Sequence, residues 1–268
     1  MTDLPRSDAL DLELEAGWLT VWFNQPEIRN PLTGERVKAL LELCAALRDD
    51  RAVRGVTFRG RGGIFCAGGD LKSFRKAFEG AMDHAEIVAM SLEAGALFEA
   101  VNTLPQLTVM AIEGAAMAGG LGLTCTGDVV VADSAAKFAF TETTIGLSPA
   151  QIAPFVLQRL GARNGRRLML LAEALSAHEA LEVGLVDRLV DGAAQMDAAL
   201  AAIRKQLARC APGAVADTKQ LILAIPSLSR HEQQQRAAET FADRMVSGEA
   251  REGIASFLEK RKPGWAQQ

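Results

Sequence analysis

Segments typical of buried strands alternate along this chain with segments in which apolar residues have helical spacing. Short apolar runs occupy residues 53–58, 107–112 and 129–131, whereas residues 34–48 and 83–104 carry apolar side chains at helical intervals. Such an alternation is typical of strands and helices packed together around a shared core. The sequence therefore predicts an α/β fold and argues against a β-sandwich or a helix bundle.

Two local patterns mark the beginning and the end of this α/β region. Residues 10–23 alternate around an Ala-Gly pair, which predicts a β-hairpin. Ser176 and Glu179 form a capping-box pattern at the start of a helix, and Gly184 marks the expected end of that helix. Residues 185–190 are the last strand-like run.

The remainder of the chain has helical character. The pattern that follows Ala193 is broken at Pro212 and Pro226, because proline is not accommodated inside a regular helix. With 268 residues, 49% of them hydrophobic, the chain can bury a substantial core without disulfides. We expect an α/β core over residues 1–195 and a helical region over residues 196–268 that serves oligomerisation.

Charge and cysteine usage exclude several classes of protein. A net charge of −4 and a pI near 5.5 argue against a nucleic-acid binder, which normally carries a basic face. Neither an apolar leader nor a long apolar run is present, so we expect no export and no membrane span. Cysteines far apart in apolar or small-residue surroundings are typical of reduced core thiols in the cytoplasm. They are Cys44, Cys66, Cys125 and Cys210.

Two glycine-rich turns are candidates for binding an oxygen atom. Gly69 precedes a possible helix that Asp70 could cap, and Gly119 follows a strand-like run and opens a short apolar helix. Glycines at such turns let backbone N–H groups point outward. Each turn alone is compatible with an ordinary loop. Together they have the composition of an oxyanion hole, which stabilises charge developing on a carbonyl oxygen.

Glu142 is an acid among small and apolar residues. Such surroundings raise the pKa of a carboxyl group, so that it can carry a proton near neutral pH. The alternative is a structural acid bonded to loop amides. His84, His178 and His231 have no partners at metal-ligand spacing and are expected on helix surfaces.

In this order and at this spacing, the segments resemble the signature regions of the crotonase (enoyl-CoA hydratase/isomerase) superfamily. The resemblance covers nearly the whole chain. It rests on F-N-Q-P-E-I-R-N-P-L from Phe23, F-C-A-G-G-D-L from Phe65, the glycine-rich residues 114–128, A-H-E-A-L-E-V-G-L-V-D from Ala177 and F-L-E-K-R-K from Phe257.

The resemblance implies a fold and an activity. The fold would be a crotonase-like spiral of strand-strand-helix turns with a helical C-terminal region. The activity would be syn addition of water to a 2-enoyl-CoA. In that mechanism the backbone N–H groups of Gly69 and Gly119 form the oxyanion hole, and Glu142 is the catalytic acid and base. No metal or redox cofactor is implied, since coenzyme A is part of the substrate.

Further residues are implied to bind coenzyme A. Arg29, Ala67 and Asp70 would lie along its channel, and Phe257 and Lys260 would meet its nucleotide end from a neighbouring subunit. The basic residues 260–262 could then neutralise phosphates on an otherwise acidic protein. The resemblance also implies a homotrimer or a dimer of trimers, with an acyl-CoA substrate and no nucleic-acid or membrane partner.

One departure from the family pattern affects the mechanism. Family hydratases usually carry a first glutamate three residues after the second oxyanion glycine, and this chain has Gly122 there. A single-acid mechanism is what the residues permit. A Δ3,Δ2-enoyl-CoA isomerase, which needs one base, is therefore the alternative enzyme, and a catalytically silent CoA-thioester binder is the alternative of another class. Other acids weighed for a direct role are Asp83, Glu86, Glu93 and Glu113.

The segment that follows Glu142 indicates a branch of the superfamily. Residues 147–156 lack the glycine-rich stretch of many enoyl-CoA hydratases. They look closer to enzymes that hydrate glutaconyl-type thioesters, including methylglutaconyl-CoA and isohexenylglutaconyl-CoA, as does the C-terminal K-R-K-P-G-W-A-Q. A carboxylated substrate of this type would need a cationic or amide-rich patch at the distal end of the acyl pocket.

Overall fold

The computed structural model describes residues 4–70 and 74–266. Within these ranges, six strands form one sheet in the order β1-β2-β3-β4-β6-β9, and three short strands form a second in the order β5-β7-β8. The β1–β2 pair is the expected antiparallel hairpin, and the rest of the larger sheet is parallel. The strands are β1 Leu10–Glu15, β2 Trp18–Phe23, β3 Gly55–Gly60, β4 Leu107–Ile112, β5 Ala115–Met117, β6 Val129–Asp133, β7 Lys137–Ala139, β8 Leu175–Ser176 and β9 Arg188–Val190.

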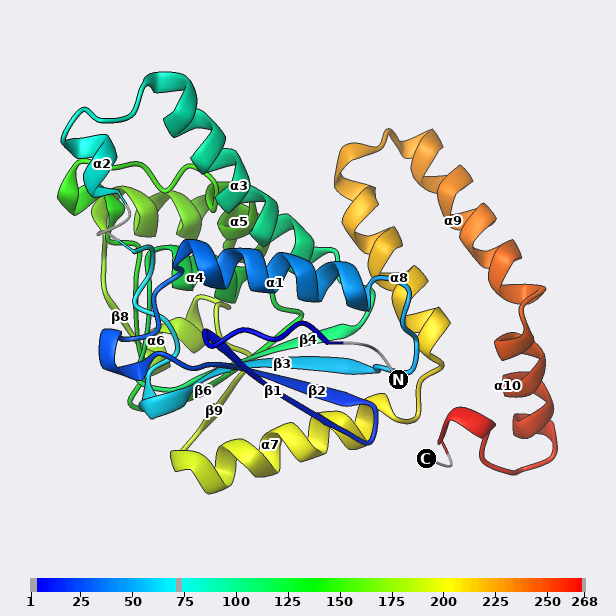
Figure 1. The fold of residues 1–268 in the computed structure, drawn as a ribbon. Helices are drawn as coiled ribbons and strands as arrows, with labels where there is room; N and C mark the ends of the chain where they lie inside the picture. The colour runs from blue at the N-terminus through cyan, green and yellow to red at the C-terminus, as the bar shows by residue number, and fades with distance from the viewer. Residues whose placement is uncertain (1–3, 71–73, 267–268) are drawn as a thin grey trace.

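Helices cover both faces of the larger sheet, which confirms the α/β prediction. Figure 1 shows α1 and α3 on one face and α7 on the other. The helices are α1 Gly34–Leu47, α2 Arg75–Phe78, α3 His84–Asn102, α4 Gly119–Cys125, α5 Ala153–Leu171, α6 Ala177–Glu182, α7 Gly192–Leu207, α8 Pro212–Ala224, α9 Arg230–Met245 and α10 Gly248–Leu258.

The two faces follow from the alternation of side chains along the strands. Met110 and Ile112 of β4 lie in the large core under α1 and α3, whereas Val109 and Ala111 lie in a second apolar cluster with α7. Successive strand residues point to opposite faces, so a continuous apolar run serves both clusters. Because α7 begins at Gly192 and packs on the sheet, the expected boundary at residue 195 falls inside a core-packed helix.

The last two helices have little buried surface of their own. No α9 residue is buried, and Ser256 is the buried residue of α10. Large apolar side chains there are exposed, including Phe241 at 68% and Phe257 at 82%. Figure 1 shows α9 and α10 extending away from the sheet. Within the described ranges, no helix is both long enough and apolar enough to cross a membrane.

The structure corrects two sequence-based expectations. Strand β5 lies inside the glycine-rich run, where only a turn and a helix were expected. Cys210 is exposed, so the expectation of a core thiol was wrong there, whereas Cys44, Cys66 and Cys125 are buried. The helix expected directly after Asp70 falls on residues 71–73, outside the described residues. The three histidines are exposed on helices, as expected.

Candidate active site

Residues 65–69 run between two other backbone segments and are hydrogen-bonded to both. On one edge, the Ala67 amide donates to the Arg29 carbonyl at 3.0 Å, and the Leu32 amide donates to the Gly68 carbonyl at 2.8 Å. On the other edge, Cys66 forms a parallel bridge with β5. The predicted glycine turn is thereby fixed beside the predicted Arg29 region.

Two buried polar side chains hold the loop that carries Arg29. Asn30 is fully buried in a left-handed conformation with φ 53°, and its Nδ2 donates to the carbonyls of Arg61 and Ile64 at 3.0 and 2.7 Å. Arg36 is also fully buried and donates to the Pro31 carbonyl. Because a buried polar group is costly unless it is hydrogen-bonded, these contacts specify one loop geometry.

A close backbone approach brings the two glycine turns together. Gly68 has φ +101°, and a β-carbon added there would lie 2.9 Å from Cβ of Ala118. Ala118 has φ 47° and ψ −123°, a conformation that is strained for a residue with a β-carbon. Strain of this kind persists only where surrounding contacts impose it, and here it sets the direction of the Gly119 amide.

The amides of Gly69 and Gly119 are neighbours. The amide nitrogen of Gly69 lies 3.8 Å from the position that a β-carbon on Gly119 would take. Among the hydrogen bonds of residues 4–70 and 74–266, neither amide is a donor. Two unengaged N–H groups at one place are what an oxyanion hole requires. Their binding of a thioester oxygen stays a prediction.

The immediate surroundings of these amides are apolar. The ring of Phe74 lies 3.3 Å from the position of a β-carbon on Gly69, and Leu32 and Phe98 lie at 3.4 and 3.9 Å from the equivalent position on Gly119. Hydrogen bonds to a developing anion are stronger in such surroundings than in water. Burial raises the pKa of the nearby Cys66 thiol to about 11, so that thiol is not a nucleophile near neutral pH.

Glu142 follows the strand that pairs with β5 in the smaller sheet. Strands β5 and β7 are parallel, with Met117 opposite Ala139. Gly119 follows β5 and Glu142 follows β7 after similarly short connections. Since the two strands are parallel and end at the same edge of their sheet, Gly119 and Glu142 lie beyond the same end of it.

The Glu142 carboxyl group has a buried, unpartnered oxygen. It begins a 3-10 turn, Glu142–Ile145, which ends at Gly146. The Oε2 atom is buried and has no hydrogen-bond partner among the described residues. Burial raises the pKa of Glu142, and its own backbone N–H lowers it by a smaller amount. Both the burial and the missing partner favour the protonated form of this carboxyl group over the charged form.

Gly122 is covered by Ile152. A β-carbon at position 122 would lie 2.2 Å from Cγ2 and 2.6 Å from Cβ of Ile152, which is only 3% exposed. The space that a side chain at position 122 would need is therefore already filled. The sequence showed that position 122 lacks the usual glutamate. It did not predict that Ile152 covers this position.

The other acids weighed from the sequence have structural partners or are exposed. Glu113 is paired with Arg59, with its Oε2 and Oε1 atoms 2.7 and 3.0 Å from the guanidinium nitrogens. Asp83 and Glu86 form the capping box of α3, and Glu93 is exposed. Within the described ranges, His, Cys, Asp and Glu side chains form no cluster of three that could hold a metal ion.

The residues expected to bind coenzyme A lie in two places. Ala67 and Arg29 are adjacent to the glycine turns, Asp70 follows Gly69, and Arg29 is exposed. Phe257 and Lys260 lie on and just after α10, which Figure 1 shows at the opposite side of the molecule from α2. Within one chain, therefore, these two residues do not join the site.

The basic cluster near the C-terminus is partly engaged. Arg261 pairs with Glu252 through two hydrogen bonds of 2.6 and 2.9 Å and with Glu259 through a third. This pairing lowers the pKa of Glu252 to about 2. The Arg261 guanidinium is therefore held by carboxylates of its own chain, whereas Lys260 is exposed.

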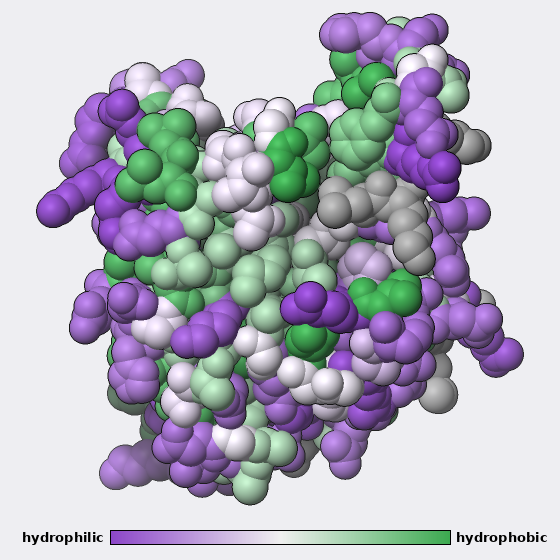
Figure 2. All heavy atoms as spheres, turned by 90° about the vertical axis from the view of Figure 1, so that its left-hand side faces the viewer, coloured by the Kyte–Doolittle hydropathy of each residue, from purple (hydrophilic) through white to green (hydrophobic). Residues whose placement is uncertain are grey.

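Exposed apolar side chains flank the end of the molecule that carries the site. Phe78 of α2, Leu92 of α3 and Ile145 beside Glu142 are 62%, 62% and 55% exposed. Figure 2 views this end, and hydrophobic residues gather in patches near its upper edge between hydrophilic ones. An apolar rim of this kind is common around ligand grooves.

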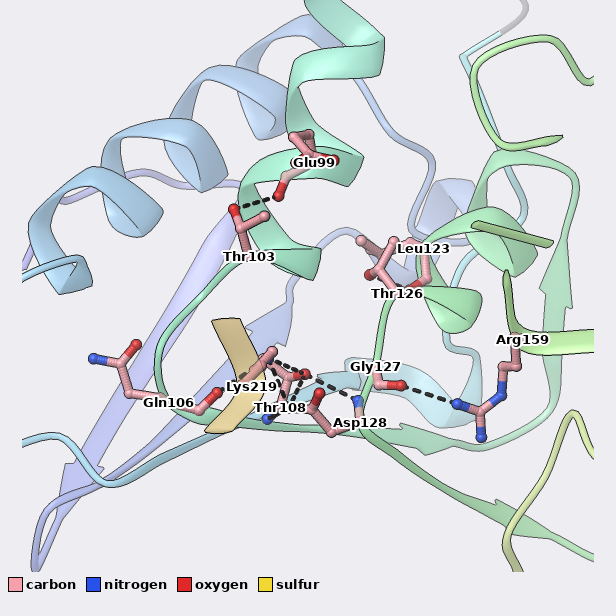
Figure 3. A network of polar contacts seen from close by, with 10 residues as sticks. All are labelled: Glu99, Thr103, Gln106, Thr108, Leu123, Thr126, Gly127, Asp128, Arg159 and Lys219. Atoms are coloured by element: carbon pink, nitrogen blue, oxygen red, sulfur yellow. Dashed lines mark hydrogen bonds and ion pairs between the residues drawn. The ribbon is translucent and has the colours of Figure 1, made fainter. Parts of the chain in front are cut away.

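An ion pair between the buried Lys219 and the partly exposed Asp128 joins α8 to the connection between α4 and β6. The Lys219 ammonium donates to Asp128 at 2.7 Å and to the Gln106 carbonyl at 3.2 Å. Asp128 also accepts from the amide and hydroxyl of Thr108, as Figure 3 shows. A cavity of about 780 Å³ adjoins this network. Of the cations drawn in Figure 3, Lys219 pairs with Asp128 and Arg159 pairs with Asp187. We therefore interpret this network as structural.

Two unengaged backbone amides in apolar surroundings, with the half-buried Glu142 at the same end of the smaller sheet, suit a carbonyl compound that reacts through an enolate. Comparison with known proteins gives the family. The family model for enoyl-CoA hydratase/isomerase matches residues 13–268. The chain belongs to this family, within the crotonase superfamily, and the predicted fold is confirmed.

Solved structures and curated relatives agree with this assignment. AtuE of Pseudomonas aeruginosa is 40% identical, with a TM-score of 0.93, over 97% of this chain and 100% of that one. An enoyl-CoA hydratase/isomerase from Marinobacter aquaeolei is 34% identical, with a TM-score of 0.92 and the same coverage. Human enoyl-CoA hydratase domain-containing protein 2, mitochondrial, is 33% identical over 93% of this chain and 85% of its own length.

Proposed function

We propose that this protein hydrates a 2-enoyl-CoA thioester and that Glu142 carries the proton in both steps. The observation that carries the proposal is the buried, unpartnered Oε2 atom of Glu142, at the same end of the smaller sheet as the Gly119 amide. A protein that only bound the thioester would have no use for such an acid, because a buried carboxyl group without a partner is costly.

The backbone amides of Gly69 and Gly119 would bind the thioester oxygen. When water adds to C3, the electron pair of the double bond moves through C2 to this oxygen and forms an enolate. The hydrogen bonds from the two N–H groups become stronger as that negative charge develops, which lowers the activation barrier for water addition. Neither amide has another acceptor in the described part of the chain, so no existing hydrogen bond must break first.

Glu142 would act first as base and then as acid. As a carboxylate it takes a proton from water while the oxygen bonds to C3, and as a carboxylic acid it returns a proton to C2. One group on one side of the substrate produces syn addition. Burial raises the pKa of Glu142, which supports this role because it makes the protonated form easier to reach.

The acyl group is proposed to be of the glutaconyl type, with a second carboxylate. A polar pair adjoins the apolar wall at Ile152: Nε2 of Gln151 donates to Oγ of Ser91 at 3.0 Å. The Ser91 hydroxyl keeps its own proton, which it can donate to a substrate carboxylate. A carboxylate on the substrate would also help to orient water where the chain offers one acid.

Isomerisation of a 3-enoyl-CoA is the second candidate, and the Gly122–Ile152 contact favours it. An isomerase moves one proton between two carbons and needs no water. An aliphatic side chain over Gly122 suits that reaction at least as well as hydration. The two reactions differ in product mass, since hydration adds one water and isomerisation conserves mass.

The remaining parts of the proposal concern assembly. Phe257 and Lys260 would contact the nucleotide end of coenzyme A bound to a neighbouring subunit, in a homotrimer or a dimer of trimers. The exposed apolar surface of α9 and α10 supports such an assembly. We place the protein in the cytoplasm and in acyl-CoA metabolism.

A mass-spectrometric screen of acyl-CoA thioesters tests the proposal. The panel contains 2-enoyl and 3-enoyl thioesters, each with and without a second carboxylate, and the purified protein is compared with Glu142→Gln. We expect products heavier by one water from 2-enoyl thioesters and none with the variant. If only 3-enoyl thioesters are converted, the protein is an isomerase and not a hydratase. If no thioester is converted, a protein that only binds the CoA thioester remains.

A further inference from the structure

Gln151 and Ile152, which are consecutive, each fill the space over a glycine on a different helix. Ile152 covers Gly122 of α4. Gln151 covers Gly95 of α3, where an added β-carbon would lie 2.3 Å from its Oε1 atom. The pair is therefore inserted between α3 and α4, and Gln151 is fixed there by its hydrogen bond to Ser91.

Ile152 packs on the face of α4 that Gly119 shares with Gly122. Gly119 and Gly122 are three residues apart on this helix, and residues at that spacing share a face. Phe98 lies near the position of a β-carbon on Gly119 and also packs against Phe155, with ring centroids 6.1 Å apart. This face of α4 is thus packed against side chains without polar atoms.

We propose that Ile152 is a specificity-determining residue, an inference that rests on the proposed function. Its side chain keeps water away from the α4 side of the bound enoyl thioester. Water and proton transfer are then confined to the Glu142 side. The aliphatic group at position 152, together with the missing side chain at position 122, sets the balance between hydration and isomerisation.

The shared volume is tested first, by thermal unfolding of four proteins: the unchanged chain, Gly122→Ala, Ile152→Gly and the double variant. Ile152→Gly is used because Cβ of Ile152, at 2.6 Å, would itself clash with an added β-carbon. Gly122→Ala should lower Tm by several degrees in the unchanged chain and should be neutral or favourable when combined with Ile152→Gly. We expect the two changes to depart from additivity by at least about 3 °C. Additive shifts would overturn the inference.

The chemical role is tested by rates of hydration of crotonyl-CoA and isomerisation of a 3-enoyl-CoA, both followed by mass. Ile152→Gly should raise the ratio of hydration to isomerisation by at least about fivefold, because space for water opens beside the substrate. Leu160→Gly is the matched control, since it removes a buried side chain of similar size from α5. Ile152→Ala, which keeps a β-carbon, is the second variant and should shift the ratio less.

The outcomes separate this inference from the proposed function. An equal ratio in the unchanged chain and in Ile152→Ala and Ile152→Gly would overturn the inference and leave the proposed function intact. An equal shift with Leu160→Gly would also overturn it, because the effect would then be general loosening of the helix. Absence of both reactions in the unchanged chain would overturn the proposed function, and the inference with it.

Discussion

The Lys219 ammonium lies 2.7 Å from Oδ2 of Asp128 and so ties α8 to the connection between α4 and β6. The side chains are 10% and 26% exposed. Removing Lys219 breaks a charge-assisted hydrogen bond and leaves the Asp128 carboxylate with the amide and hydroxyl of Thr108 as donors. We expect Lys219→Met to lower the free energy of unfolding by about 2 kcal/mol in chemical denaturation.

The control for this prediction is Lys38→Met. Lys38 faces Glu42 across one helical turn at 4.0 Å, with 75% of its side chain exposed, and its loss should change stability by no more than about 0.5 kcal/mol. Adding Asp128→Asn to Lys219→Met should restore part of the loss. Equal effects of Lys219→Met and Lys38→Met would contradict a structural role for the Lys219–Asp128 pair.

Replacing Glu142 by Gln should abolish most turnover and leave binding of the thioester intact. The amide keeps the shape of the side chain and cannot carry the proton, so we expect kcat to fall by about 10²–10⁴-fold. Binding is measured by calorimetry with a non-reactive acyl-CoA. Glu93→Gln, on the exposed surface of α3, is the control and should keep full activity. Near-normal turnover by folded Glu142→Gln would remove Glu142 from the mechanism.

The same substitution should stabilise the folded protein at neutral pH. Burial raises the pKa of Glu142 above its ordinary value of 4.5, so the folded state binds more protons than the unfolded state between those two pKa values. Stability from this group is thus present below pH 4.5 and is lost as pH rises through the folded pKa. In thermal melts, the Tm of Glu142→Gln should exceed that of the unchanged chain at pH 7–8, and the difference in Tm should decrease toward pH 4.5. A gap that is constant with pH would exclude this origin.

Gly68→Ala should both destabilise the protein and reduce activity. Its added β-carbon would meet Cβ of Ala118 at 2.9 Å, which would separate the two glycine turns. Gly80→Ala is the matched control, because Gly80 also has positive φ and has no atom within 4 Å of an added β-carbon. We expect a loss of about 1 kcal/mol for Gly80→Ala and at least about 2 kcal/mol more for Gly68→Ala. The measurements are chemical denaturation and kcat for both variants. Similar losses of stability and activity in Gly68→Ala and Gly80→Ala would argue against a tight contact between Gly68 and Ala118.

A glutaconyl-type thioester should be a better substrate than crotonyl-CoA. We expect kcat/KM to differ by at least about tenfold, which corresponds to roughly 1.4 kcal/mol of transition-state stabilisation. Ser91→Ala should reduce this preference more than it reduces turnover of crotonyl-CoA, because Ser91 offers a proton to a carboxylate. If crotonyl-CoA is used equally well or better, the proposal of a carboxylated substrate is wrong and the isomerase is favoured.

Local patterns predicted those elements in which propensity, capping and burial agree. The helix at 83–104 was recognisable from its spacing and is capped by Asp83, and the Ser176–Glu179 capping box is present as expected. Strand β5 was missed because Ala115–Met117 contains no β-branched or aromatic residue and is a strand only through its pairing with β7. Cys210 was misplaced because an apolar neighbourhood in sequence does not determine burial.

The candidate site was predictable as residue types and not as contacts. Gly69, Gly119 and Glu142 were identified from motifs, and the parallel β5–β7 pair explains why the last two share one end of a sheet. The Ile152–Gly122 contact joins residues 30 positions apart, and no periodicity encodes it. Arg36, buried against backbone carbonyls, contradicts the rule that arginine is exposed, so its role required coordinates.

The contact between Ile152 and Gly122 also constrains the order in which such a site can change by mutation. A lineage that gained a carboxylate at position 122 while isoleucine remained at 152 would have an overpacked core. The new β-carbon would lie only 2.2 Å from Cγ2 of Ile152. A lineage that first lost the isoleucine would have a cavity instead, which proteins tolerate more readily when stability is in excess. Divergence between one-acid and two-acid members would therefore pass through position 152 before position 122, and the two positions would show strong epistasis.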